Sequence, residues 1–308
     1  MQQPSLYDQF CCSYRDNLQS PLHPLSDNLD SETYRIMEKD PVKYSQYERA
    51  LAAAMHDLKK PTMSEGSRDK YSSSKGYTQT IIQEVMLPCN GFFTLLYNIY
   101  IVCTVAVRNR CRSQNPLTVL VVGAGRGPLV QAALNAAILS NVDVQIWAVE
   151  KNFNAVVTLR NRFKQQQQQQ SPSVEALTNT VTVLFCDMRD LRSKCPDLSV
   201  DIIVSELLGS WGDNEASPEC LHAMESGGFL KSGGVMIPQS YCSYAAPVSC
   251  SALWMQARDM PQAPTLAGRH ISTPSSGLDS PYVVNMHSYC LLSSAKPLFQ
   301  VPNKNFFF

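Results

Sequence analysis

The chain has 308 residues, of which 44% are hydrophobic and 17% are charged, as is usual for a folded globular protein. Its 26 basic and 26 acidic residues give a formal net charge of zero, which excludes a global electrostatic attraction to nucleic acid or acidic lipid. The eleven cysteines and five histidines are scattered without metal-ligand spacing, so we expect reduced thiols and no metal site.

The first strong helix signal begins at Asp40-Pro41. Aspartate can cap the free N–H groups of a first turn, and proline fits the first helical position. Apolar residues then recur at the spacing of a single helix face, namely Tyr44, Tyr47, Leu51, Ala54 and Leu58. This helix should end near Lys59-Lys60-Pro61.

The next segment, residues 61–113, does not fit the pattern on either side of it. Residues 61–80 are polar and predict a flexible insertion, whereas an apolar run extends from Phe92 towards Val107. The run is shorter than the roughly 20 residues that a membrane-spanning helix needs. A buried insertion is therefore favoured, and a span over residues 85–107 is the alternative. The N-terminus shows no signal peptide.

From Leu117 onwards, short β-rich runs alternate with helical ones. We expect strands at Thr118–Val122, Val144–Val149, Val181–Phe185 and Asp201–Val204, a helix that ends near Ser140, and another at Ala155–Phe163. This alternation predicts an α/β fold with a parallel sheet and helices on both faces. The tract Gln165–Gln170 predicts a low-complexity loop. After Pro238 the helical periodicity stops, and antiparallel β structure is expected.

A glycine turn separates the first of these strands from its helix. Gly123, Gly125 and Gly127 would let backbone N–H groups and the positive end of the helix approach a ligand closely. Glu150 ends the next strand, where a carboxylate can accept both hydroxyl hydrogens of a ribose. A tight structural turn and an exposed strand-end acid are the simpler alternatives.

Dinucleotide-binding enzymes share this layout, so NAD is a rival ligand. However, the third glycine comes one residue too early for G-x-G-x-x-G, and Pro128 follows it. A third strand ends at Asp187 and Met188. Asp187 could hydrogen-bond an adenine amino group, and Met188 offers a backbone contact. Three strand ends that meet at one crevice favour an adenosyl ligand without pyrophosphate.

Two glutamates follow the fourth strand, at Glu206 and Glu215, and a glycine-containing loop joins them. The loop can fold back so that both carboxylates face one point. A guanidinium is planar and permanently charged, and it pairs well with carboxylates, so this pair could orient an arginine side chain. Two solvated loop acids are the alternative, and Asp213 lies in the same loop.

Several motifs then resemble one family, the type II protein arginine methyltransferases, which form symmetric dimethylarginine. The resemblance is carried by SELLGSWGDNEASPECL from Ser205, VVGAGRGPLV from Val121, AVEKNFNAVVTL from Ala148, CDMRD from Cys186, LQSPLHPLSDNLDSETY from Leu18 and MEKDPVKYSQY from Met37. It implies a Rossmann-like S-adenosylmethionine-dependent methyltransferase domain followed by an incomplete β-barrel segment.

The resemblance also implies roles for individual positions. It places Glu206 and Glu215 as the catalytic pair, and Met37 as a specificity position beside the acceptor nitrogen. Gln19 and Leu22 would line the cofactor or substrate cleft. The implied contacts of S-adenosylmethionine are Tyr34, Lys43, Tyr44, Gly123, Gly125, Glu150, Asp187 and Met188.

The same resemblance suggests a domain organisation. Residues 1–33 would be a linker and N-terminal arm, residues 34–237 the methyltransferase domain with an atypical insertion at 61–113, and residues 238–308 a truncated β-barrel domain. The family's N-terminal barrel, which binds a β-propeller partner, is expected to be absent from this chain. Expected substrates are Arg/Gly-rich segments of histones and RNA-processing proteins, in the cytoplasm and nucleus, without direct binding of nucleic acid or membrane. A non-catalytic fragment that binds cofactor or partners is the alternative function.

Overall fold

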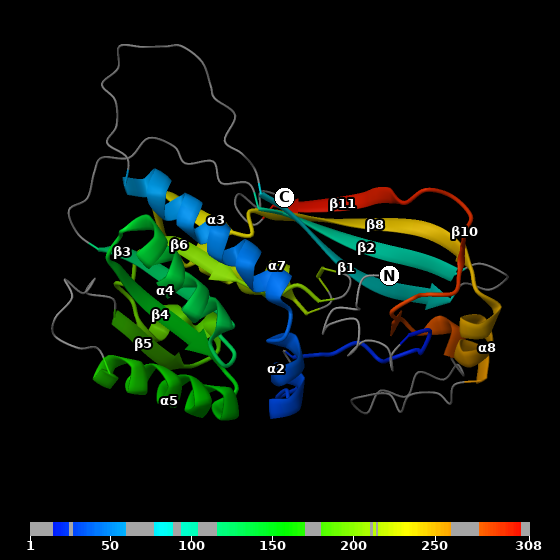
Figure 1. The fold of residues 1–308 in the computed structure, drawn as a ribbon, viewed down its shortest axis with the longest axis horizontal. Coiled ribbons are helices and arrows are strands. Elements are labelled where there is room, and N and C mark those ends of the chain that lie inside the picture. The colour runs from blue at the N-terminus through cyan, green and yellow to red at the C-terminus, as the bar shows by residue number, and fades with distance from the viewer. Residues whose placement is uncertain are drawn as a thin grey trace, which may run out of the picture.

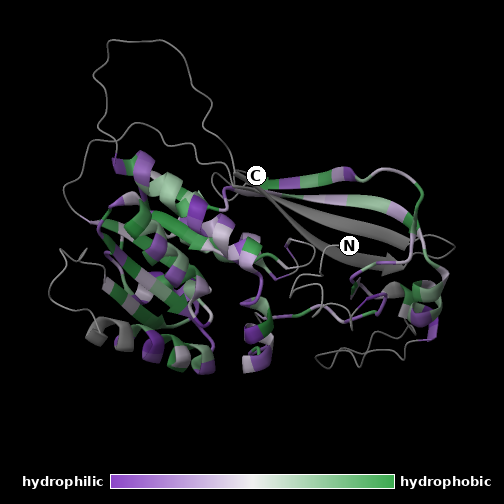
Figure 2. Cartoon of the chain, in the orientation of Figure 1, coloured by the Kyte–Doolittle hydropathy of each residue, from purple (hydrophilic) through white to green (hydrophobic). Residues whose placement is uncertain are grey.

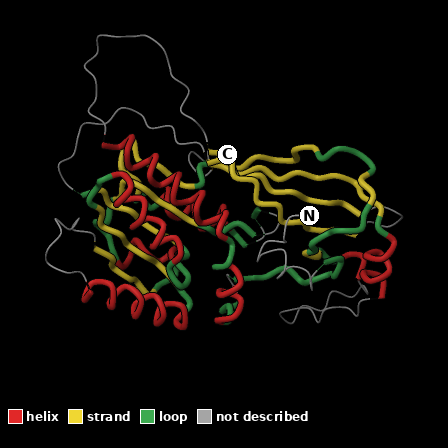
Figure 3. The backbone as a smooth tube through the Cα atoms, viewed as in Figure 1, coloured by secondary structure: helices red, strands yellow, loops and turns green. Residues whose placement is uncertain are grey.

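The computed structural model describes residues 15–24, 27–59, 77–88, 94–103, 116–169, 180–209, 212–213, 215–259 and 277–302. These residues form two sheets that lie side by side (Figure 1). One sheet is parallel and flanked by helices, and the other is antiparallel with a short helix at its far end (Figure 3).

The parallel sheet has five strands in the order β5-β4-β3-β6-β7. Its strands are β3 (Leu117–Val122), β4 (Val144–Glu150), β5 (Thr180–Phe185), β6 (Val200–Ser205) and β7 (Leu230–Ile237). The strand order reverses between β3 and β6, because the chain runs outward to β5 and then returns to the other side of β3. In an open α/β sheet, such a reversal opens a crevice at the carboxyl ends of the strands.

Helices cover both faces of this sheet. They are α3 (Pro41–Lys59), α4 (Pro128–Ser140), α5 (Phe153–Gln169), α6 (Leu191–Lys194) and α7 (Ser217–Ser226), with a 3-10 turn, η2 (Met188–Asp190), after β5. Alternate residues of β3 point to opposite faces. Val119 and Val121 pack in a core cluster with α3 and α4, whereas Leu120 and Val122 pack in a second cluster with α7. Figure 2 shows the resulting concentration of hydrophobic residues on these strands.

The second sheet is antiparallel, as predicted for the chain after Pro238. Its strands run in the order β10-β8-β2-β1-β9, and β11 pairs with β8. They are β1 (Tyr77–Pro88), β2 (Thr94–Cys103), β8 (Ser240–Ser249), β9 (Tyr282–Val283), β10 (Cys290–Leu291) and β11 (Lys296–Pro302). Helix α8 (Ser251–Asp259) and the turn η3 (Gly277–Asp279) follow β8 in the chain.

An N-terminal arm connects the two sheets. It forms bridges from Arg15 to Asn285 and from Gln19 to Val283 beside the second sheet, and then enters helix α2 (Ser31–Met37) below α3 (Figure 1). Asp30 caps α2 by accepting a hydrogen bond from the Thr33 N–H at 2.8 Å. None of the side chains of α2 is fully buried, so polar contacts help to hold this helix in place.

Three expectations about secondary structure were wrong. Tyr77–Thr80, expected in a flexible insertion, begin β1. Within the apolar run, Thr94–Cys103 form β2. Gln165–Gln169 continue α5 rather than forming a loop, because glutamine is a good helix former next to an established helix. Helical structure also does not stop at Pro238, since Ser251–Asp259 form α8.

Within the described part of the chain, none of the helices has the length and hydropathy that a bilayer crossing would require. The same residues contain no group of three or more potential metal ligands.

Candidate functional site

A cleft of about 650 Å³ lies where the two sheets meet. The arm and α2 form one wall, and the carboxyl ends of the parallel strands β3, β4, β5 and β6 form another. Residues 283–285, which follow β9, line the side nearest the second sheet. The cleft therefore occupies the place that the reversal of strand order predicts for a ligand.

The structure brings every sequence-predicted site residue into this cleft. Those residues come from the arm, α2, α3 and the four strand ends, and they are Gln19, Leu22, Tyr34, Met37, Lys43, Tyr44, Gly123, Gly125, Glu150, Asp187, Met188, Glu206 and Glu215. They are spread over nearly 200 residues of sequence, so the parallel sheet and the arm together create their proximity. Their individual roles remain predictions.

Glu150 is buried at the base of the cleft and is held by the backbone on both sides. One carboxylate oxygen accepts a hydrogen bond from the Gly125 N–H at 2.7 Å, and the other accepts one from the Asn152 N–H at 2.7 Å. Each oxygen keeps a second lone pair for a ligand hydroxyl. The glycine turn and the carboxylate therefore form one preorganised unit that can accept two hydrogen bonds.

The glycine turn has no room for side chains. Gly123 and Gly125 have φ angles of +69° and +54°, in the left-handed region. A Cβ on Gly123 would lie 2.6 Å from the Leu207 side chain, and one on Gly125 would lie 3.1 Å from the Tyr34 ring. Glycine at these positions thus leaves the backbone close to the cleft and lets Tyr34 cover the turn.

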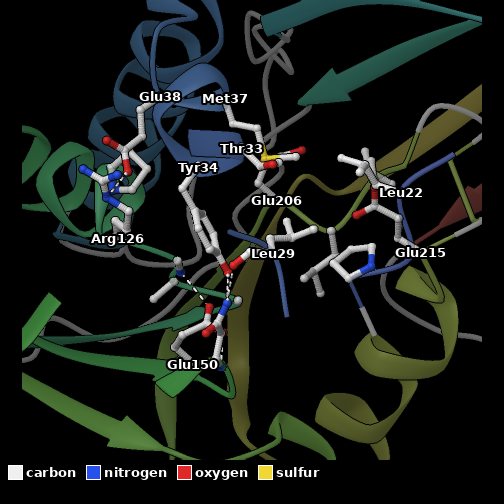
Figure 4. A pocket seen from close by; sticks show the side chains of 18 of the residues that line it. Leu22, Leu29, Thr33, Tyr34, Met37, Glu38, Arg126, Glu150, Glu206 and Glu215 are labelled. Atoms are coloured by element: carbon white, nitrogen blue, oxygen red, sulfur yellow. Dashed lines mark hydrogen bonds and ion pairs between the residues drawn. The ribbon is translucent and has the colours of Figure 1, made fainter. Parts of the chain in front are cut away.

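Contacts of Tyr34 and its neighbours close α2 over the cleft. The Asn152 side-chain amide donates hydrogen bonds to the Leu29 carbonyl at 2.9 Å and to the Tyr34 hydroxyl at 3.4 Å (Figure 4). Burial and the nearby charge of Glu150 raise the pKa of Tyr34 to about 12, so its hydroxyl keeps its proton. The side chain therefore acts as a neutral wall of the cleft.

Sequence reasoning missed Arg126, which ties both ends of α2 to the glycine turn. Its Nη1 donates to the Ser31 carbonyl at 3.0 Å, and its Nε lies 3.2 Å from Glu38 Oε1. Glu38 and Asn152, also missed, line the same cleft. Its position between two glycines indicated that Arg126 belongs to the turn, but nothing in the sequence indicated that it would contact α2.

Asp187 lies at the end of β5 and is already paired. Its Oδ1 accepts hydrogen bonds from Arg189 N and Nε, both at 2.9 Å, and its Oδ2 accepts one from Nη2 at 2.7 Å. Hydrogen bonding to Arg189 lowers the pKa of Asp187, so the group remains ionised. An adenine amino group at this position would therefore donate to a carboxylate that already accepts hydrogen bonds from Arg189.

Glu206 follows β6 and is fixed from two sides. The buried Tyr47 hydroxyl donates to the Ser205 carbonyl at 2.9 Å, which anchors the strand end, and Lys43 Nζ lies 3.2 Å from Glu206 Oε2. Burial alone would lower the pKa of Lys43, but the charge of Glu206 and its hydrogen bond, together with Tyr44 and Asp40, outweigh this effect and raise the pKa. The ammonium is therefore charged, and it pairs with Glu206.

Glu215 is held close enough to Glu206 for their charges to interact. Burial, followed by repulsion from Glu206, raises the pKa of Glu215 to about 8. Figure 4 shows both carboxylates among the side chains around the cleft, with Glu150 at its other end in this view. Glu206 therefore pairs with Lys43, whereas Glu215 is mostly protonated at neutral pH.

The loop between the glutamates folds back, as its spacing predicted. Gly209 and Gly212 form an antiparallel bridge in which the Gly212 N–H donates to the Gly209 carbonyl at 2.9 Å. The Ala216 N–H then donates to the Asp213 carbonyl at 2.8 Å, just before α7 begins. Asp213 is partly buried in the same loop, which raises its pKa. The backbone itself thus returns Glu215 to the cleft.

The raised pKa of Glu215 predicts a pH dependence of ligand binding. A cation that pairs with both glutamates requires Glu215 to lose its proton, so its affinity should rise with pH until about pH 8 and then level off. Calorimetric titration of an arginine-containing peptide between pH 6 and pH 9 measures this. Glu215→Gln should bind more weakly and lose the dependence.

The same group affects stability with the opposite sign. The folded pKa of Glu215 lies above its ordinary value of 4.5, so the unfolded state binds fewer protons between these two values. Stability should therefore fall by up to about 1.4 kcal/mol per pH unit between roughly pH 4.5 and pH 8 from this group alone. Denaturant titrations of the parent and Glu215→Gln chains, compared across this range, isolate its contribution. A stability difference between the two chains that does not change with pH would contradict this expectation.

The strand order, the helices on both faces and the cleft at the carboxyl ends define a Rossmann-like ligand-binding domain. Residues 5–237 match the family model described as PRMT5 arginine-N-methyltransferase. The chain belongs to this family.

Relatives in the family cover nearly all of this chain. Protein arginine N-methyltransferase 5 of Xenopus laevis is 37% identical over 305 residues, which are 98% of this chain and 37% of the relative. Protein arginine N-methyltransferase skb1 of Schizosaccharomyces pombe is 35% identical over 289 residues, 94% of this chain and 34% of the relative. The chain thus spans little more than a third of the length of these relatives.

Solved structures overlap with part of the fold. A putative S-adenosyl-L-methionine-dependent methyltransferase from Methanococcus maripaludis is 16% identical, with a TM-score of 0.28, over 40% of this chain and 48% of the other. The plantazolicin methyltransferase in complex with SAH is 14% identical, with a TM-score of 0.26, over 38% and 36%. The strand order, rather than these partial overlaps, establishes the architecture described above.

Proposed function

We propose that this chain binds S-adenosylmethionine and transfers its methyl group to guanidino nitrogens of protein arginines. The observation that carries this proposal is the meeting of two carboxylates, Glu206 and Glu215, in one cleft with the glycine turn and Glu150. Membership of the arginine methyltransferase family supports it. The activity is proposed for the part of the family protein that this chain represents.

The cleft residues fit the donor. Glu150 offers two buried oxygens to ribose hydroxyls, the glycine turn leaves backbone N–H groups close to the ligand, and Asp187 and Met188 line the end suited to a base. Bound S-adenosylmethionine would supply an electrophilic methyl group on a sulfonium. Before the substrate binds, Lys43 already pairs with Glu206.

The paired glutamates would receive the substrate arginine. A guanidinium stays protonated in proteins, so the carboxylates orient it and stabilise its charge rather than deprotonate it beforehand. Glu206 is paired with Lys43, and Glu215 would release its proton as the guanidinium pairs with it. The pair would orient one terminal nitrogen towards the methyl group of a bound donor, and a carboxylate would accept the proton that this nitrogen loses.

The finer features of the activity also belong to this proposal. Met37 lines the cleft beside α3, where it could shape the space next to the acceptor nitrogen and direct symmetric dimethylation. Arg/Gly-rich segments of histones and RNA-processing proteins are the proposed substrates, and cytoplasm and nucleus the proposed locations. These points rest on the resemblance of the motifs to type II enzymes.

The test uses the purified chain with an Arg/Gly-rich peptide. Calorimetry should detect binding of S-adenosylhomocysteine, and mass spectrometry should detect monomethyl and then symmetric dimethylarginine when S-adenosylmethionine is added. Binding of donor without any methylated peptide would instead support a cofactor-binding, non-catalytic role. A folded chain that binds neither donor nor peptide would refute the proposal.

A further inference from the structure

Tyr241 belongs to the second sheet but packs into the core of the parallel one. It lies near the start of β8, where it pairs with Ile101 of β2 on one side and with Val301 of β11 on the other. Its side chain is fully buried in the same core cluster as Tyr47 and Leu51 of α3. Both neighbouring strands therefore fix the backbone from which this ring projects.

The ring of Tyr241 lies directly against the loop that joins the two glutamates. A Cβ on Gly212 would lie 2.6 and 2.9 Å from two atoms of the ring, and 3.2 Å from Ser243 Oγ. Gly212 has a φ of +97°, which favours glycine, and it makes the bridge to Gly209 that turns the loop back. The contact is therefore between a rigid aromatic surface and the tip of the turn, with no side chain between them.

We propose that Tyr241 is a positioning residue for the paired carboxylates, because its ring supports the turn that returns Glu215 to the cleft. This inference rests on the proposed function, and it assigns to the second sheet a part in the chemistry of the first. Arginine recognition would then depend on how β8 is held between β2 and β11.

The two glutamates depend on different supports. Glu206 is placed by Tyr47, which bonds the Ser205 carbonyl, and by Lys43, so its position comes from α3. Glu215 stands three residues after Gly212, beyond the bridge that the ring supports. Loss of the ring should therefore move Glu215 while leaving Glu206 and the donor end of the cleft in place.

The ring rather than the hydroxyl carries this role. Among the described residues, none makes a hydrogen bond with the buried Tyr241 hydroxyl. Removing a hydroxyl without a partner leaves no partner unsatisfied, and the phenyl ring keeps the contact with Gly212. Phenylalanine should therefore substitute for Tyr241, and leucine should not.

The experiment compares Tyr241→Leu with Tyr241→Phe, and uses Phe229→Leu as a matched loss of a buried ring in the other core cluster. The full chain is used, and each variant is first checked for cooperative thermal unfolding. The first measurement is the carbon-13 NMR titration of the Glu215 carboxyl. In Tyr241→Leu its pKa should fall from about 8 towards the ordinary value, as the group becomes better solvated and more distant from Glu206. Tyr241→Phe and Phe229→Leu should leave it unchanged.

The second measurement is function. Tyr241→Leu should lower kcat/KM for an arginine peptide by roughly a hundredfold, the scale expected for a catalytic group displaced by about 1 Å, with little change in the Kd of S-adenosylhomocysteine. Tyr241→Phe should keep kcat/KM close to the value of the parent chain. If Tyr241→Leu weakens donor binding as much as peptide turnover, or does no more than Phe229→Leu, the residue is merely structural and the inference is wrong.

A double-mutant cycle tests the contact itself. Gly212→Ala should shift the Glu215 titration on its own, because its Cβ meets the ring, and part of this shift should disappear when Tyr241→Leu removes that ring. Additive shifts would overturn the inference. The titrations need no methyl transfer, so a parent chain that shows the coupled shifts but methylates nothing would refute the proposed function and leave the placement of Glu215 by Tyr241 standing.

Discussion

Replacing Glu206 with glutamine is expected to lower methyl transfer to an arginine peptide by roughly a hundredfold to a thousandfold, the scale for loss of one preorganised electrostatic contact. The amide keeps the shape of the side chain but removes the negative charge that a guanidinium needs. Glu215 does not replace the lost contact, because the pair then offers the guanidinium one carboxylate in place of two. Radiolabelled methyl transfer at saturating donor measures the effect.

Two further readouts separate loss of charge from loss of fold. Lys43 is buried beside Glu206, so the variant should also be less stable, since it leaves an ammonium without its ionised partner. Donor affinity should change little, because Glu150 and the glycine turn are untouched. The matched control is Glu219→Gln, an exposed carboxylate in the first turn of α7. Equal activity of Glu206→Gln and the control would exclude the proposed role of the pair.

Replacing Glu150 with alanine is expected to weaken binding of S-adenosylhomocysteine by roughly a hundredfold or more, because about 1–3 kcal/mol is lost for each buried donor left unsatisfied. The variant removes the acceptor of the Gly125 and Asn152 N–H groups, so the turn loses its support as the ligand loses its two acceptors. Calorimetry of the variant, the parent and Glu219→Gln measures the difference.

The affinity for donor should respond more strongly to this change than to any change at the glutamate pair. A Glu150→Ala chain that binds the donor as tightly as the parent would mean that the nucleoside lies elsewhere in the cleft. Glu150→Gln gives an intermediate case, because its single carbonyl oxygen can satisfy only one of the two N–H groups.

The sequence predicted the parallel sheet well because its signals are local. Each of the four predicted strands is an apolar run with a glycine or an acid within two residues of its end, and α3 shows a regular buried face from Tyr47 to Leu58. The fifth strand, β7, was not predicted. The strand-end residues of the site followed from the same logic, since strand ends in a parallel sheet meet at one edge, whereas those of the arm, α2 and α3 came from the family resemblance. Thirteen residues chosen by motif and position accordingly line one cleft.

What the sequence did not predict depends on contacts between distant segments. The strands β1 and β2 pair with each other, and β2 also pairs with β8, whereas hydropathy alone could not distinguish them from a buried helix. The pairing of Arg126 with Glu38 joins residues 88 positions apart. The contact of Tyr241 with Gly212 crosses from one sheet to the other. No local pattern encodes such contacts.

The way α2 is attached has a thermodynamic consequence for every ligand of the cleft. None of the side chains of this helix is fully buried, yet the helix supplies Tyr34 and Met37 to the binding surface. Arg126 and Asn152 hold it in place through the Ser31 and Leu29 carbonyls, beside the Tyr34 ring that covers the glycine turn. A ligand that contacts α2 in this position stabilises that position of the helix. By reciprocity, anything that fixes α2 there raises the affinity of the cleft for the ligand. We therefore expect ligand binding in the cleft and the ordering of α2 with the preceding arm to be thermodynamically coupled.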